Sequence, residues 1–254
     1  MTTFNLMHCQ PDPRKFVLWA SRQGGLPAGG DLGYALHAAL HRVFGACAPK
    51  PFYYRDERAG LLAYTRNSAE ELREAAALCA APDLAEALGL DAGPRSPGLG
   101  VRAFPLQWDA GRVLGFEVRV RPMRRVKVND RKHGSERDAY REPEARREDE
   151  KDLAREGVYT RWLAEQFETT GAAKLVEARM TRFQLTAVMR RTQAATQGDG
   201  LRQSRTITGP DATFSGHLRV ENTEAFARLL MRGVGRHRAF GFGMLLLSPA
   251  SISA

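Results

Sequence analysis

The sequence predicts an α+β protein of two tandem ferredoxin-like domains, because one order of elements, β-α-β-β-α-β, can be traced twice along its 254 residues. Apolar residues recur at helical spacing in some segments and alternate with polar residues in others. Helix-start signals precede the helical segments. Residues 91–98 have the composition of a linker between the two halves. We place the first domain at residues 1–92 and the second at residues 100–254.

The first half begins with an expected strand at residues 4–9. A glycine-rich segment then leads to Asp31, a suitable residue for capping a helix N-terminus. The helix that follows should face the core with one apolar stripe. That stripe comprises Leu32, Leu36, Leu40 and Val43. Two further strands are expected at residues 52–54 and 61–64, around a turn at residues 57–60.

A second helix of this half should start at Ser68, because Glu71 lies three residues later and completes a capping box. Its inward face is expected to carry Leu72, Ala75, Ala76 and Cys79. A last strand at residues 101–106 would complete the first β-α-β-β-α-β unit.

The second half opens with a strand in which apolar residues alternate with charged ones from Phe116 to Val120. Residues 127–152 mix both charge signs, and we expect them to form a solvated loop or insertion. The remaining elements are a helix with Tyr159, Trp162, Leu163 and Phe167 on one face, a long strand at 174–191, a polar hairpin tip at 193–205, a strand at 213–220, a helix from Glu224 and a strand at 244–247.

The charge balance favours a polyanionic partner. The chain has 38 lysines and arginines against 29 acidic residues, and most of the basic residues are arginines, which suit phosphate recognition. A merely basic globular enzyme is the alternative that composition leaves open. The chain shows neither a secretion signal nor a run of 18 apolar residues, so we expect a cytoplasmic protein with no membrane contact.

The cysteines give no sign of a metal site. Cys9, Cys47 and Cys79 are scattered and lack the spacing of metal ligands, which is typical of reduced cysteines in the cytoplasm. We therefore expect neither a metal nor another cofactor.

The glycine-rich ending, residues 232–247, is the most informative segment. An expected helix precedes it and an expected strand follows it. Nucleotide-binding loops run in the opposite order, strand, loop and helix, because they hold phosphate at a helix N-terminus. Glycines interleaved with arginines instead fit the close approach of an extended polyanion, and RNA is the natural candidate.

Five segments carry a family resemblance. They are Tyr34 to His37, Arg119 to Arg125, Gly134 to Tyr140, Val158 to Leu163 and the glycine-rich Gly235 to Leu247. In this order they resemble the CasE family, the CRISPR-associated endoribonucleases that process repeat RNA in type I-E systems. The resemblance covers most of the chain, and it implies the same fold, two tandem ferredoxin-like (RRM-like) domains.

The resemblance implies metal-independent cleavage of the hairpin repeat in CRISPR precursor RNA. The 2′-hydroxyl would attack the scissile phosphate and the 5′-oxygen would leave, giving a 2′,3′-cyclic phosphate or a 3′-phosphate. His37 matches the family's catalytic histidine and Tyr34 its tyrosine three residues earlier, on the same helix face. Arg42 stands where the family commonly has lysine, five residues after the histidine, and the resemblance implies that it supplies positive charge to the phosphate. A lone helix histidine is more often structural, and His41 is the fallback for the same role.

Two groups of residues are expected to contact RNA. The alternative interpretation is that they only form a solvated surface. The first group consists of strand and hairpin arginines, namely Arg119, Arg121, Arg124, Arg125, Arg202 and Arg205. The second lies in the glycine-rich loop and comprises Gly235, Arg236, His237, Arg238, Gly241 and Gly243. Because the major groove of A-form RNA is deep and narrow, recognition should depend on shape and phosphates.

The implied partners are the repeat RNA hairpin, which as mature crRNA stays bound, and other Cas subunits of the surveillance complex. A type IV processing subunit is a second possibility within this class. A catalytically idle RNA-binding module of the RRM kind is the alternative from another class. A basic small-molecule enzyme is disfavoured, because the sequence shows no nucleophile elbow and no phosphate loop.

Overall fold

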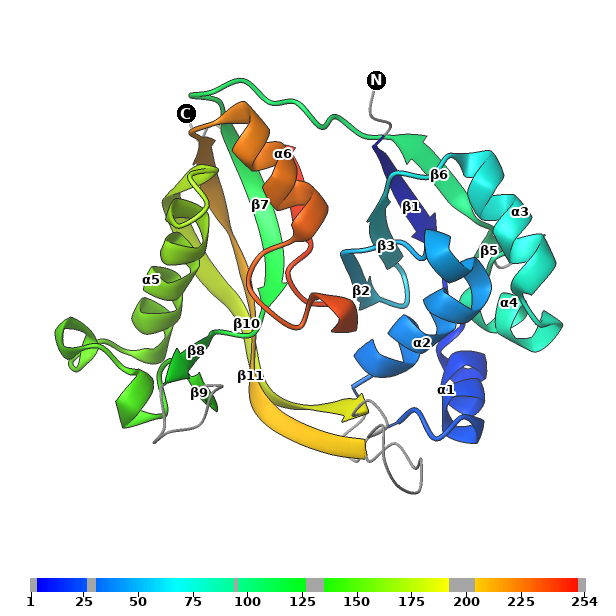
Figure 1. Cartoon of the computed structure of the whole chain (residues 1–254), viewed down its shortest axis with the longest axis horizontal. Coiled ribbons are helices and arrows are strands. Elements are labelled where there is room, and N and C mark those ends of the chain that lie inside the picture. The colour runs from blue at the N-terminus through cyan, green and yellow to red at the C-terminus, as the bar shows by residue number, and fades with distance from the viewer. Residues whose placement is uncertain (1–3, 27–30, 94–95, 127–134, 192–203, 251–254) are drawn as a thin grey trace, which may run out of the picture. The chain divides into compact units, whose positions relative to one another are not determined.

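The computed structural model describes residues 4–26, 31–93, 96–126, 135–191 and 204–250 (Figure 1). The chain divides into two compact units. The first unit comprises Met1–Phe104, Leu185–Gly209 and Ala239–Gly241, and the second comprises Pro105–Gln184, Pro210–Arg238 and Phe242–Ala254. None of the described helices is long and apolar enough to span a membrane.

The first unit contains a four-stranded antiparallel sheet in the order β2-β3-β1-β6. Its strands are β1 (Asn5–Cys9), β2 (Phe52–Asp56), β3 (Gly60–Thr65) and β6 (Gly100–Ala103), with short strands β4 (Ala92–Gly93) and β5 (Ser96–Pro97) paired separately. Its helices are α1 (Pro13–Arg22), α2 (Gly33–Phe44), α3 (Ala69–Cys79) and α4 (Pro82–Leu88). With α2 and α3 as the two crossovers, this order of strands is the expected ferredoxin-like plan.

Local capping explains where α2 and α3 begin. Asp31 lies one residue before the N-cap of α2, and its Oδ1 accepts a hydrogen bond from the backbone N of Gly33 at 2.9 Å. The predicted capping box of α3 is confirmed: Ser68 Oγ accepts from the Glu71 amide at 3.1 Å, and Glu71 Oε2 accepts from the Ser68 amide at 2.6 Å. The prediction that Cys79 faces inward is wrong. Cys79 is the last residue of α3, and its side chain is exposed.

Two helices of the first unit are not in the expected plan. Asp12 caps α1 through Oδ1, which accepts from two backbone amides, and Pro13 occupies the first helical turn. This helix buries Phe16 and Trp19, whose stacked ring centroids are 5.7 Å apart. Pro82 likewise starts α4. Asp-Pro and Ala-Pro followed by apolar residues were therefore overlooked helix-start signals.

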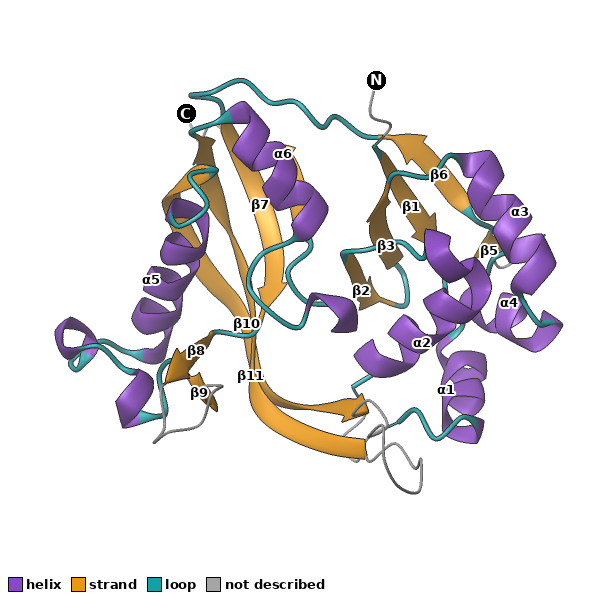
Figure 2. Ribbon diagram, viewed as in Figure 1, coloured by secondary structure: helices purple, strands orange, loops and turns teal. Residues whose placement is uncertain are grey.

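The second unit repeats the same strand order, β10-β11-β7-β12, in a second antiparallel sheet (Figure 2). Its elements are β7 (Val113–Val120), β8 (Met123–Val126), β9 (Ser135–Asp138), α5 (Arg155–Glu168), β10 (Ala173–Arg191), β11 (Ser204–Val220), α6 (Thr223–Arg232) and β12 (Leu245–Pro249). The long hairpin strands β10 and β11 also supply residues of the first unit. The prediction of two ferredoxin-like folds is confirmed.

Strand register explains the core of the second unit. Val118 of β7 lies opposite Phe214 of β11 and Leu245 of β12, and all three are fully buried. Residues directly opposite one another project to the same face of a sheet, so these side chains form one apolar surface. Helix α5 packs there, with the Phe167 ring edge-on to Phe116 at a centroid distance of 5.8 Å.

Candidate functional site

Helix α2 brings together the predicted Tyr34 and His37 with His41. All three project from one side of the helix, because three and four residues are close to one turn. The rings of His37 and His41 are 4.5 Å apart and nearly perpendicular, with an interplanar angle of 73°. His37 is half-buried, whereas His41 is exposed.

Phe240 of the glycine-rich loop packs on the same helix and belongs to the same unit. Its ring lies 5.8 Å from the His37 ring and 6.3 Å from that of Tyr34. Gly33 makes this approach possible, because a Cβ there would overlap the Phe240 carbonyl oxygen. Sequence reasoning did not assign Phe240 to the site, since about 200 residues separate it from the histidine helix.

The surroundings of His37 favour its neutral form. Partial burial lowers the pKa of His37, the positive charge of His41 lowers it further, and Lys50 adds to the effect, so that the pKa reaches about 4. The ring is therefore uncharged at neutral pH, with a lone pair that can accept a proton.

Arg42 projects from a different part of α2. Five residues correspond to a rotation of about 140° relative to His37 on an α-helix. The guanidinium lies 5.7 Å from the ring centroid of Trp19 of α1, and the side chain is exposed. Its proposed phosphate contact remains a prediction.

In the second unit, Arg119 and Arg121 were expected on an exposed strand face. This prediction is wrong for Arg121, which directly follows β7 and is only 1% exposed. Arg119 donates from Nε and a terminal nitrogen to the two oxygens of buried Asp211, at 2.9 and 2.6 Å. Both guanidiniums lie against the Phe242 ring, at 4.3 Å for Arg119 and 5.6 Å for Arg121. These arginines therefore hold the loop residue Phe242 in place.

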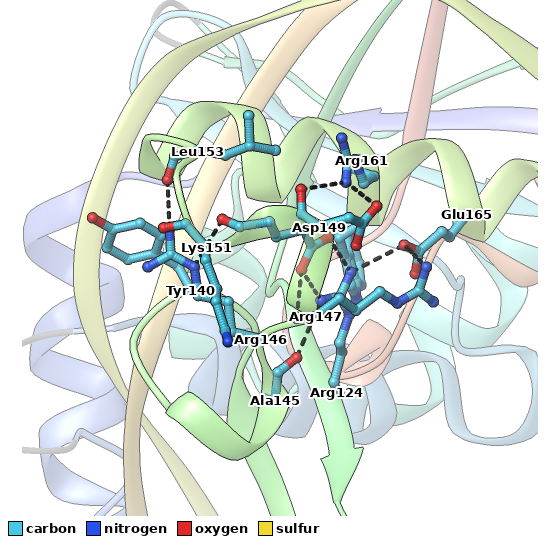
Figure 3. A network of polar contacts seen from close by, with 12 residues as sticks. Arg124, Tyr140, Ala145, Arg146, Arg147, Asp149, Lys151, Leu153, Arg161 and Glu165 are labelled. Atoms are coloured by element: carbon cyan, nitrogen blue, oxygen red, sulfur yellow. Dashed lines mark hydrogen bonds and ion pairs between the residues drawn. The ribbon is translucent and has the colours of Figure 1, made fainter.

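Arg124 is likewise engaged inside the protein (Figure 3). It pairs with both oxygens of Glu150, at 2.6 and 2.9 Å, and with Glu165 of α5 at 3.0 Å. Glu150 is fully buried, and the hydrogen bonds from Arg124 lower its pKa. Arg125, the next residue of β8, is exposed and remains available for an RNA contact.

The charged segment ending at residue 152 is therefore more structured than predicted. Arg146 donates to three backbone oxygens, those of Glu150, Lys151 and Leu153 (Figure 3). Tyr159 of α5 donates to Asp138 at 2.7 Å. The charged side chains of this segment therefore form ion pairs and hydrogen bonds with one another and with α5, in addition to contacting solvent. The first part of the segment, residues 127–134, lies outside the described residues.

Glu136 of β9 holds two residues of the glycine-rich loop. Its Oε1 lies 3.0 Å from Nε of Arg236, and its Oε2 lies 3.0 Å from Nε2 of His237. The His237 side chain is 3% exposed, and its backbone has a φ of 59°, which few residues other than glycine adopt. We call the three residues Glu136, Arg236 and His237 the loop clasp. Sequence reasoning did not single out Glu136.

The loop glycines permit close packing. A Cβ at Gly235 would lie 2.8 Å from the Trp162 ring, and one at Gly243 would overlap the Val234 carbonyl oxygen. Gly241 belongs to the first unit, where a Cβ would lie 3.2 Å from the Phe52 ring. These contacts account for the glycines by protein packing, and their contact with RNA remains a prediction.

Arg238 donates to the backbone oxygen of Arg232 at 3.2 Å. Burial and the neighbouring positive charges of Arg232 and Arg236 lower its pKa. An anion beside Arg238 would oppose this lowering, because a nearby negative charge favours the charged guanidinium. Arg202 lies outside the described residues, as does the side chain of Arg205, so the expected hairpin contacts remain predictions. Among the described residues, no three His, Cys, Asp or Glu side chains are grouped as metal ligands.

Solved structures with the same fold come from CRISPR systems. The Cse3 endoribonuclease bound to a 19-nucleotide RNA is 18% identical, over 98% of this chain and 100% of that chain, with a TM-score of 0.61. Cse3 of Thermus thermophilus, bound to an RNA representing a pre-cleavage complex, is 17% identical over 97% and 100%, with a TM-score of 0.62. At these identities the likeness concerns the fold. A search of curated protein sequences finds no significant match.

The sequence itself identifies the family. A family model described as "CRISPR associated protein" matches residues 7–249. This match includes the histidine helix and the glycine-rich loop, two of the segments on which the resemblance was based. The chain therefore belongs to the family of CRISPR-associated proteins.

Proposed function

We propose that the protein is an endoribonuclease that cleaves the repeat hairpins of CRISPR precursor RNA without a metal ion. The observation that carries the proposal is the side of α2 on which neutral His37 lies beside Tyr34 and His41. Membership of the CRISPR-associated family supports the choice of RNA. The RNA-bound Cse3 structures, which share this fold, support it as well.

The reaction begins at the 2′-hydroxyl before the scissile phosphate. His37 accepts the proton of this hydroxyl, because its half-buried ring is neutral at physiological pH. The 2′-oxygen then attacks phosphorus, the 5′-oxygen leaves, and a 2′,3′-cyclic phosphate forms. Tyr34, one turn before His37, orients the attacked nucleotide through its hydroxyl. Burial beside Phe240 limits water at the ring and so favours this intramolecular attack over hydrolysis.

The hairpin is held by positive groups of the second unit. Arg236 and Arg238 are partly exposed on the glycine-rich loop, and Arg125 is exposed on β8. Contacts with phosphates release counterions, so the affinity should fall steeply with salt. After cleavage the protein keeps the hairpin and joins other Cas subunits in the surveillance complex.

The test is cleavage of the repeat hairpin from the organism's own CRISPR array, in EDTA, with the products mapped. We expect cleavage at one position and a 2′,3′-cyclic phosphate end. His37→Ala should lower the single-turnover rate by about 10²–10⁴-fold while leaving hairpin affinity nearly unchanged. His217→Asn, at an exposed pair with Glu177 in the second unit, is the matched control and should cleave normally.

A substrate with 2′-deoxyribose at the nucleotide before the scissile phosphate tests the nucleophile separately. It should bind as tightly as the unmodified hairpin and remain intact. Cleavage of this substrate, or cleavage only with added divalent metal, would contradict the mechanism. Tight binding without any cleavage of the unmodified hairpin would instead favour an idle RNA-binding module.

A further inference from the structure

We propose that His41 is a second catalytic residue, which donates a proton to the 5′-oxygen as it leaves. This assignment rests on the proposed endoribonuclease function and extends it to the leaving group. The two histidines would then divide the proton transfers between them, with His37 as the acceptor and His41 as the donor.

The geometry suits this division. His37 and His41 are one helical turn apart on α2, with ring centroids separated by 4.5 Å. In a phosphoryl displacement the attacking and leaving oxygens lie on either side of one phosphorus atom. Two rings at this spacing can each reach one oxygen from the same side of the phosphate, within ordinary hydrogen-bonding distance of about 2.6–3.2 Å.

Burial and charge distinguish the two rings. Two positive rings in contact repel each other, so the pair favours a single proton. Partial burial disfavours charge on His37, and Lys50 adds to this effect. His41 is exposed at the end of the pair, where water or a phosphate can stabilise a positive ring. A positive charge is therefore less disfavoured on exposed His41 than on half-buried His37, which suits His41 to the donor role.

The reaction balances with these two groups and no other reactant. The O–H bond of the 2′-hydroxyl breaks, and its proton passes to His37. The 2′-oxygen forms a bond to phosphorus, and the P–O5′ bond breaks with its electron pair remaining on O5′. His41 gives its proton to O5′, so the products are a 2′,3′-cyclic phosphate and a 5′-hydroxyl. Transfer of a proton from His37 to His41 through water restores the starting state.

Other groups near the pair are less suited to donate. Tyr34 lies on the opposite side of His37 from His41, one turn toward the helix start. Arg42 is turned toward Trp19. Lys50 is exposed and follows the helix, and its positive charge can stabilise the phosphate without moving a proton. Each of these groups can be distinguished from His41 by experiment.

The experiment compares two hairpins that differ only at the scissile linkage, one with the natural 5′-oxygen and one with sulfur in its place. A thiolate leaves without being protonated, so the sulfur hairpin needs no proton donor. We expect His41→Ala to slow cleavage of the oxygen hairpin by about 10²–10⁴-fold and to slow the sulfur hairpin by less than about tenfold. His37→Ala should slow both hairpins by similar factors. Circular dichroism checks that each variant is folded, and His41→Gln provides a second substitution at this exposed position.

Three outcomes would overturn the assignment. In the first, His41→Ala cleaves the oxygen hairpin at the normal rate. In the second, His41→Ala slows cleavage of both hairpins equally. In the third, Tyr34→Phe, and not His41→Ala, is slow on the oxygen hairpin but regains its cleavage rate on the sulfur hairpin. Failure of the unaltered protein to cleave either hairpin would count against the proposed function itself. The two failures are therefore distinguishable.

Discussion

Replacing Arg119 with methionine should strongly destabilise the second unit. The sequence alone would place Arg119 on the charged, solvent-facing side of β7, where such a change would cost little. The guanidinium makes two hydrogen bonds with the Asp211 carboxylate, at 2.9 and 2.6 Å. The Arg119 side chain is only 16% exposed and that of Asp211 only 4%. Methionine is similar in length to the apolar stem of arginine, so the substitution mainly removes the guanidinium, with its ion pair and its contact with the Phe242 ring.

The expected size follows from this burial. Removing one partner of a buried ion pair typically costs about 3–5 kcal/mol, because the remaining charge stays in a poorly solvated site. We expect about 3 kcal/mol here, at the low end of this range, because Gln184 still donates a hydrogen bond to the remaining Asp211 carboxylate at 2.9 Å. Arg228→Met is the matched control. This change breaks the ion pair of Arg228, whose side chain is 66% exposed, with Glu224, whose side chain is 86% exposed. It should lower the free energy of unfolding by less than about 0.5 kcal/mol.

Native-state hydrogen exchange of the β7 and β11 amides measures the free energy of unfolding of this unit alone. The double variant Arg119→Met/Asp211→Asn should recover part of the loss, because it no longer buries a carboxylate without its arginine. If Arg119→Met and Arg228→Met lower the free energy of unfolding by the same amount, the reasoning is refuted, and Arg119 would again be a candidate for RNA binding.

Three other predictions concern the histidine helix and the loop. The His37 ring should titrate in NMR with a midpoint near 4 rather than 6.5, and stability should fall as the pH drops through this range, because the unfolded chain binds the proton more readily. Gly243→Ala should lower the melting temperature more than Gly111→Ala, since both have φ near 80° but only Gly243 is crowded by a backbone oxygen; similar shifts would point to strain alone. Glu136→Ala should weaken hairpin binding even though it removes a negative charge, whereas Glu224→Ala should not; tighter binding by Glu136→Ala would show that the loop clasp does not order the loop.

The elements that sequence predicted well have strong local signals. The capping box at Ser68 marks the start of α3, and alternation from Phe116 to Val120 marks β7. The same patterns gave the strand order only indirectly, through the ferredoxin-like plan. Helix α1 was overlooked because its signal, Asp12 followed by Pro13, is short and the expected plan had no place for it.

The site was predictable where it depends on spacing along one helix. Tyr34 and His37 share a side of α2 because of helical periodicity. Phe240 and Asp211 could not be found in this way, because their partners are distant in sequence and no local pattern encodes the pairing. The same reason explains why Arg121 and Arg124 were expected at the surface: charge alone does not reveal a buried partner.

The network around Arg124 also bears on how this protein responds to random mutation. Loss of Arg124 leaves the buried carboxylate of Glu150 without its arginine, and loss of Glu150 leaves the largely buried Arg124 without its main partner, so such variants should fold at low temperature and fail on warming. Genetic screens would recover them as temperature-sensitive alleles, whereas changes at His37 would be defective at every temperature. Second-site suppressors of these alleles should accordingly restore the balance of charge within the network rather than appear on the histidine helix.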